Sequence, residues 1–128
     1  MNLPITLSAV AAAALINIWL SIRCGQVRTS EKVSVGDGGN EKLIRRMRAH
    51  SNFIENAPIV LVMIAALEFA HPGSTALAAV AGVFMLGRVA HGLGMEGGSF
   101  GIGRMIGTMI TLLTLLGLAI WAIITAMA

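Results

Sequence analysis

The sequence predicts an all-α integral membrane protein, a four-helix bundle formed by one domain over residues 1–128. Of these residues, 56% are hydrophobic and only 12% are charged, whereas soluble domains carry about 25% charged residues. The apolar residues gather in four stretches, each long enough for a helix to cross a hydrocarbon core of about 30 Å. Disordered chains have low hydrophobicity. The composition therefore excludes an ordinary soluble domain and a disordered chain.

The first predicted span covers residues 3–22, which contain no charged side chain. A cleaved signal peptide is the alternative, but such a peptide starts with a basic segment, and no basic residue precedes this stretch. Residues 23–40 contain several charges and the glycine-rich run 36–39, so we expect a polar, flexible connection there. Cys24 is expected to be a small buried residue, with a reactive or lipidated thiol as the alternative.

The second predicted span covers residues 41–70 and begins with a long polar segment. Asn40 followed by Glu41 is typical of a helix start, because Asn caps the first turn and an acid is favourable near the positive end of the helix. The basic first turns then give way to an apolar stretch. We expect this helix to end before His71, which is followed by Pro72 and Gly73.

The third and fourth predicted spans cover residues 75–95 and 101–127. Residues 96–99, with the sequence Glu-Gly-Gly-Ser, are expected to form a tight turn between them. Gly103 and Gly107 make a GxxxG pair, a spacing that is compatible with close helix contact in lipid.

The basic residues indicate an orientation in the membrane. Seven of the nine lie in the first connection or in its continuation into the second helix, and the positive-inside rule therefore makes this connection cytoplasmic. With four spans, the turn between the third and fourth helices is then cytoplasmic too, and both termini lie outside. The seven residues are Arg23, Arg28, Lys32, Lys42, Arg45, Arg46 and Arg48.

Polar residues form a stripe along the second helix. Arg45, Arg48, Asn52 and Glu55 are spaced 3, 4 and 3 apart, which puts them within an arc of about 80°. Glu55 lies about 22 Å from the helix start, where a carboxylate must be paired or hydrated. Arg88, His91 and Arg104 of the neighbouring helices are expected at similar depth.

Two interpretations of this cluster are open. It could be a structural ion-pair network that locks the bundle. It could instead bind an anionic ligand, because four arginines against one acid leave a net positive charge, and intramembrane ionisable residues are functional candidates. The spacing of the three histidines indicates no metal site.

Two sequence runs and one arginine resemble the MAPEG family, the membrane-associated proteins in eicosanoid and glutathione metabolism. The run Arg45–Pro58, RRMRAHSNFIENAP, is similar to the helix-two signature R-A-H-x-N-x-x-E-x-x-P. The run Gly87–His91, GRVAH, resembles the helix-three motif, and Arg104 stands where members place a catalytic arginine. The chain contains no tyrosine, and Met95 stands where mammalian relatives commonly have a pocket tyrosine.

The resemblance implies a homotrimer in the bacterial inner membrane, with glutathione bound between neighbouring protomers near the cytoplasmic face. Arginines would hold the two glutathione carboxylates, Glu55 would bind the ammonium, and the cationic Arg104 would stabilise the thiolate. By position, the glutathione-binding residues would be Arg48, Asn52, Glu55, Arg88 and His91, with Arg45 as a possible addition and Arg104 as the catalytic residue.

The first functional hypothesis is therefore a MAPEG-type glutathione transferase or peroxidase that acts on a hydrophobic electrophile arriving through the bilayer. The second is a non-catalytic scaffold that binds lipid or a small anion in the same cavity. A small multidrug-type transporter is a third alternative, but it would need an essential acid in the first helix, and residues 3–22 contain none.

Overall fold

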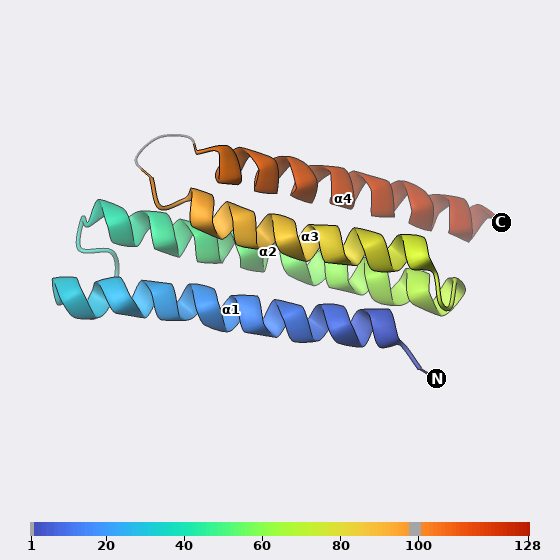
Figure 1. Ribbon diagram of the computed structural model, residues 1–128, viewed down its shortest axis with the longest axis horizontal. Coiled ribbons are helices and arrows are strands. Elements are labelled where there is room, and N and C mark those ends of the chain that lie inside the picture. The colour runs from blue at the N-terminus through green and yellow to red at the C-terminus, as the bar shows by residue number, and fades with distance from the viewer. Residues whose placement is uncertain (1, 98–100) are drawn as a thin grey trace.

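The computed structural model describes residues 2–97 and 101–128, which form four helices (Figure 1). Each helix is long and apolar enough to cross a membrane. The predicted all-α integral membrane architecture with four spanning helices is therefore confirmed. The helices are α1 (Pro4–Glu31), α2 (Glu41–Ala70), α3 (Thr75–Gly94) and α4 (Ile102–Met127).

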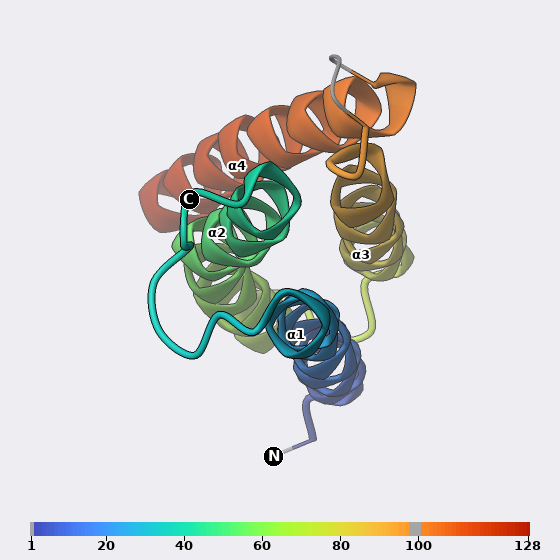
Figure 2. The same cartoon turned by 90° about the vertical axis from the view of Figure 1, so that its left-hand side faces the viewer.

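Successive helices run in opposite directions (Figure 1). The connection after α1 and the start of α4 lie at one end of the bundle, which we call the loop end. Both chain termini and the turn before α3 lie at the other, which we call the terminal end. Viewed from the loop end, α1 and α4 lie on opposite sides of α2 and α3 (Figure 2). This order brings the polar part of α2 beside the last turns of α3 and the first turns of α4.

The first connection is shorter than the predicted range 23–40, because α1 continues to Glu31. Beyond the apolar stretch, α1 still buries Cys24 and Val27, which pack with Leu43 from the polar first turns of α2. This small second core makes the extra helical turns favourable. The expectation that residues 23–31 form part of a flexible connection was therefore wrong, and the expectation that Cys24 is buried is confirmed.

Helix α2 begins where the sequence predicts. The Oδ1 atom of Asn40 accepts a hydrogen bond from the backbone N–H of Leu43 at 2.9 Å, and Glu41 lies in the first turn. The predicted stop before His71 is also confirmed. In the predicted turn 96–99, Gly98 and Ser99 lie outside the described residues.

Glycines bring the backbones of α3 and α4 into contact. A Cβ atom on Gly107 would lie 2.5 Å from the carbonyl oxygen of Gly87 and 2.4 Å from Cβ of His91. A Cβ atom on Gly103 would lie 2.7 Å from the carbonyl oxygen of Ala90. The GxxxG pair is thus a packing motif, as the sequence indicates, and it sets the position of α4 against the end of α3.

A buried carboxylate joins α2 to α1 at the terminal end. Glu68 is 1% exposed, and it accepts hydrogen bonds from the backbone N–H groups of Ile5 and Thr6 at 2.8 and 2.7 Å. The Thr6 hydroxyl adds a third hydrogen bond at 2.7 Å. The carboxylate therefore caps free N–H groups in the first turn of α1, where the helix dipole also favours a negative charge.

Replacing Glu68 with alanine is expected to lower the midpoint temperature of thermal unfolding by several degrees. The change leaves two N–H groups of α1 without their acceptor inside an apolar environment. Thermal unfolding in detergent, followed by circular dichroism, measures the effect. Glu41→Ala is the control, because Glu41 is 86% exposed and surface ion pairs contribute little. Equal midpoints for both variants would contradict this role for Glu68.

Candidate functional site

Three helices meet in a buried polar cluster centred on Arg88 of α3. The Arg88 side chain is 2% exposed. It donates hydrogen bonds to Asn52 Oδ1 of α2 at 2.7 Å and to Thr111 Oγ1 of α4 at 2.9 Å. Its Nη2 also lies 3.5 Å from Nδ1 of His91, which is 3% exposed. We call Arg88, Asn52, His91 and Thr111 the buried cluster.

The guanidinium of Arg88 is held by neutral groups. None of the ion pairs formed by the described residues includes Arg88, and its Nε is buried without a hydrogen-bond partner. The Phe53 ring lies 6.0 Å from its Cζ atom. A buried charge without a counter-ion is unfavourable. An anion bound beside this cluster would therefore be attracted by the uncompensated charge.

A second set of polar residues faces outward from α2, beside the buried cluster. Arg48 and Glu55 form an ion pair at 2.8 Å, and their side chains are 55% and 53% exposed. Arg48 also donates to the Ser51 hydroxyl at 3.3 Å. Asn52, between them in sequence, is partly exposed and links this outer pair to Arg88. Charged and amide groups thus continue from the helix surface into the protein.

Arg45 takes a different partner from the rest of the predicted stripe. It lies 3.6 Å from Glu41, which is closer to the loop end. The predicted stripe is thus divided: Asn52 belongs to the buried cluster, Arg48 and Glu55 lie beside it, and Arg45 pairs one turn away from them.

A cavity of about 450 Å³ lies between α1 and α2. Ser51, the partner of Arg48, is one of its lining residues, and His50 beside it lies 2.7 Å from Asn17 Oδ1 of α1. Arg48 and Glu55 do not line this cavity, and Ser51 links it to the outer pair. Its lining consists of Ser21, Cys24, Gly25, Arg28, Met47, His50, Ser51 and Ile54.

Arg104 lies in the first turn of α4, and the close packing of α3 and α4 fixes its backbone. A Cβ atom on Gly94 would lie only 2.0 Å from the backbone N of Arg104. The positive charges of Arg88, Arg104 and Arg48 all act on the His91 ring. The structure therefore gathers positive charge from α2, α3 and α4 around His91.

Sequence reasoning did not find Thr111 or Glu96. Thr111 accepts a hydrogen bond from Arg88 and donates one to the Gly107 carbonyl at 2.8 Å. The sequence feature that could have indicated Thr111 is a hydroxyl residue one turn after a packing glycine. Glu96 follows α3 and accepts two hydrogen bonds from Arg46 of α2, at 2.6 and 3.3 Å, and one from Arg23 of α1. The sequence feature that could have indicated Glu96 is an acidic residue close to the strongly basic end of the bundle.

The arginines around Glu96 stabilise its charged form. Burial raises the pKa of the carboxyl group, but the hydrogen bonds and charges of Arg46 and Arg23 outweigh this effect, and the pKa lies below its ordinary value of 4.5. A lowered pKa in the folded state means that the carboxylate contributes stability above pH 4.5. This contribution is lost as the pH falls through the pKa of the folded state.

Acid is therefore expected to weaken the loop end. The midpoint temperature of thermal unfolding should change little from neutral pH down to about 4.5 and should fall below that value. Glu96→Gln should show a smaller fall over the same acid range, because it has no carboxylate to protonate. Thermal unfolding of both proteins at several pH values measures the difference. Parallel curves would show that Glu96 does not contribute to the acid sensitivity.

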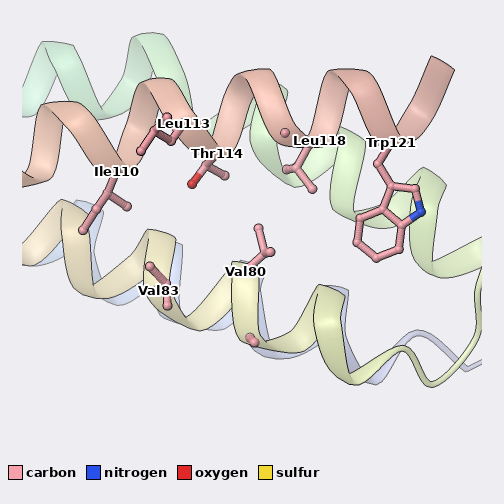
Figure 3. A pocket seen from close by; sticks show the side chains of 9 residues that line it. Val80, Val83, Ile110, Leu113, Thr114, Leu118 and Trp121 are labelled. Carbon is pink, nitrogen blue, oxygen red and sulfur yellow. The ribbon is translucent and has the colours of Figure 1, made fainter. Parts of the chain in front are cut away.

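A larger groove lies on another face of the bundle and is apolar. It has a volume of about 470 Å³ and runs between α3 and α4 (Figure 3). Its nine lining residues carry no charged side chain, and Trp121 lies at one end. Such a groove suits an acyl chain or another apolar molecule, but it contains no cationic side chain to attract an anion. We therefore place the candidate site at the buried cluster and the outer pair on α2.

Comparisons with known proteins give one match. The model of the MAPEG family matches residues 6–124, which is nearly the whole chain. No curated protein and no solved structure matches the chain.

Proposed function

Because the chain belongs to the MAPEG family, with its membrane-bound, glutathione-related roles, we propose that it is a glutathione transferase or peroxidase that acts on a hydrophobic electrophile. The main support is the uncompensated positive charge of Arg88, which is buried in the membrane-spanning part of α3 and is linked through Asn52 to a polar face of α2. Charge in this position is unfavourable, and a bound anion would offset it.

Glutathione fits the chemistry of the outer residues. It has two carboxylates and one ammonium group, and Arg48 and Glu55 offer one cation and one carboxylate on the same helix face. On binding, Arg48 exchanges part of its contact with Glu55 for a glutathione carboxylate, and Glu55 receives the ammonium. Asn52 adds an amide, and Arg45, one turn away, is a further possible partner. The buried Arg88 acts behind Asn52, by donating a hydrogen bond to it and by supplying positive charge, and His91 lies beside Arg88.

Arg104 is the proposed catalytic residue. A free thiol has a pKa of about 8.5 and is mostly protonated at neutral pH, whereas a nearby cation favours the thiolate. In a transferase reaction, the thiolate sulfur forms a bond to the electrophilic carbon while the leaving group departs with its electron pair. The Arg104 guanidinium would stabilise the thiolate before the attack.

The outer pair also supports assembly. Arg48 and Glu55 are more than half exposed on a helix that crosses the membrane. Charged side chains at this depth face other protein or a water-filled cavity rather than lipid. A homotrimer, the assembly that the family resemblance implies, would cover this face with a neighbouring protomer and would place glutathione between subunits. The concentration of basic residues makes the loop end the cytoplasmic one.

The alternative is a scaffold of the same fold that binds a lipid or a small anion without catalysis. Its support is the combination of an apolar groove between α3 and α4 with the uncompensated charge of Arg88. A lipid with an anionic headgroup would use the same attraction. In this alternative, Arg104 contributes charge and no chemistry.

A conjugation assay with an aromatic halide separates the two functions. The purified protein in detergent should accelerate the glutathione-dependent release of halide, and Arg48→Gln should reduce kcat/KM at least about tenfold, because it removes a charged hydrogen bond to the tripeptide. Lys42→Gln removes a charge from the exposed start of α2 and is the matched control. A wild-type protein that neither conjugates the halide nor reduces a lipid hydroperoxide with glutathione would contradict the enzymatic proposal.

A further inference from the structure

The geometry points to Glu96 as a positioning residue that, together with Arg23 and Arg46, fixes the start of α4 and therefore the place of Arg104 relative to the polar face of α2. We call these three residues the clasp. The inference rests on the catalytic role proposed for Arg104. The clasp itself contains no group of the proposed glutathione site.

One carboxylate in the clasp connects three parts of the chain. Arg46 of α2 donates from Nε and Nη2 to the two carboxylate oxygens of Glu96, at 2.6 and 3.3 Å. Arg23 of α1 donates to the same carboxylate. Arg46 also donates to the Arg23 carbonyl at 2.6 Å and to Gln26 at 3.2 Å. The side chains of Arg23 and Arg46 are 13% and 14% exposed and that of Glu96 is 31% exposed, so these contacts are partly shielded from water.

The end of α3 is held on two sides. On one side, Trp19 of α1 packs against Gly92, where a Cβ atom would lie 2.8 Å from the indole ring. The Arg23 guanidinium lies 4.8 Å from the centre of that ring, which extends the clasp along α1. On the other side, Gly94 meets the backbone of Arg104. Any shift of the α3 end away from α1 and α2 would therefore carry Arg104 with it.

This coupling matters because the proposed site draws residues from both helix pairs. Arg48 and Glu55 belong to α2, which packs closely with α1, whereas Arg104 belongs to α4, which packs closely with α3. The clasp joins the two pairs at the loop end, alongside the hydrogen bond from Arg88 to Asn52. A displacement of about 1 Å in a catalytic group can lower a rate by up to about 100-fold.

Two readouts test the clasp, and one of them does not need glutathione. Hydrogen exchange measures the protection of backbone amides in residues 101–108, the start of α4. An ultraviolet titration of bound glutathione measures the apparent pKa of its thiol. The variants are Glu96→Gln and Arg46→Gln, which remove the contact from opposite sides. The control is Glu68→Gln, which removes a carboxylate joining two helices at the terminal end.

Both clasp variants should exchange faster over residues 101–108, at least about tenfold, while the control matches the wild type there. The apparent pKa of the bound thiol should rise by about one unit, so that about tenfold less thiolate is present at neutral pH. The affinity for glutathione should change less than about threefold. The double variant should add little to either single change, because both remove the same contact.

Unchanged exchange at the start of α4 in the clasp variants would overturn the inference. Faster exchange without a change in the thiol titration would overturn it as well, because Glu96 would then stabilise the fold without positioning Arg104. A wild-type protein that binds no glutathione would refute the proposed function and not the clasp. In that case the exchange data alone decide whether Glu96 fixes the start of α4.

Discussion

Replacing Arg104 with alanine is expected to abolish the ultraviolet absorbance of the thiolate when glutathione is added at neutral pH. Without the guanidinium, the thiol returns towards its ordinary pKa of about 8.5 and is mostly protonated. The rate of conjugation should fall at least about 100-fold, a typical loss for removal of one group that stabilises a developing anion. Stopped-flow absorbance measures the thiolate, and turnover with an aromatic halide measures the rate.

The protein should remain folded and keep the oligomeric state of the wild type after this change, because the packing at this point of the chain uses the backbone of Arg104. Circular dichroism and size-exclusion chromatography check both properties. Lys42→Ala, which removes an exposed cation from the start of α2, should leave the absorbance intact. An unchanged thiolate absorbance in Arg104→Ala would refute the catalytic assignment.

Replacing Gly107 with valine is expected to cause a large loss of stability. Even the first added carbon would lie 2.5 Å from the Gly87 carbonyl oxygen and 2.4 Å from Cβ of His91, so α3 and α4 must separate. Overpacking typically costs about 1–3 kcal/mol, and a clash with backbone lies at or above the upper end of that range. The separation would also break the contact between Arg88 and Thr111. We expect little folded protein in detergent.

Gly117→Val is the matched control for this prediction. Gly117 lies on the same helix, and a Cβ atom there meets nothing within 4 Å. The two variants therefore add the same atoms to the same type of element and differ only in what those atoms meet. Thermal unfolding of the purified proteins measures the difference. Similar midpoints would contradict the close packing of α3 and α4 at Gly107.

Features that depend on local sequence or on helix periodicity could be predicted. Hydrophobic length predicts the spans, and the Asn40 cap predicts the start of α2 because a cap acts within one turn. The spacing of Arg48 and Glu55 predicts that they share a face, and they form an ion pair. The close contact at Gly103 and Gly107 follows from small residues one turn apart.

Features that depend on contacts between helices could not be predicted from the sequence. The continuation of α1 to Glu31 depends on Leu43 of α2, which gives its last turns a surface to bury. The partners of Arg88 are an amide and a hydroxyl, and the chain offers many of both, so charge matching could not identify Asn52 and Thr111. Similarly, no spacing rule relates Glu96 to Arg23 and Arg46, because their contact depends on how α3 packs between helices.

The most direct test of the central claim, that the polar face of α2 and the buried cluster bind glutathione, is a calorimetric titration of the purified protein in detergent. The account predicts a saturable heat for the wild-type protein and an affinity at least about tenfold lower for Glu55→Gln, which removes the partner of the ammonium group. The absence of any glutathione heat in the wild-type protein would contradict the account. Such a result, together with a lipid retained at the site, would favour the non-catalytic scaffold.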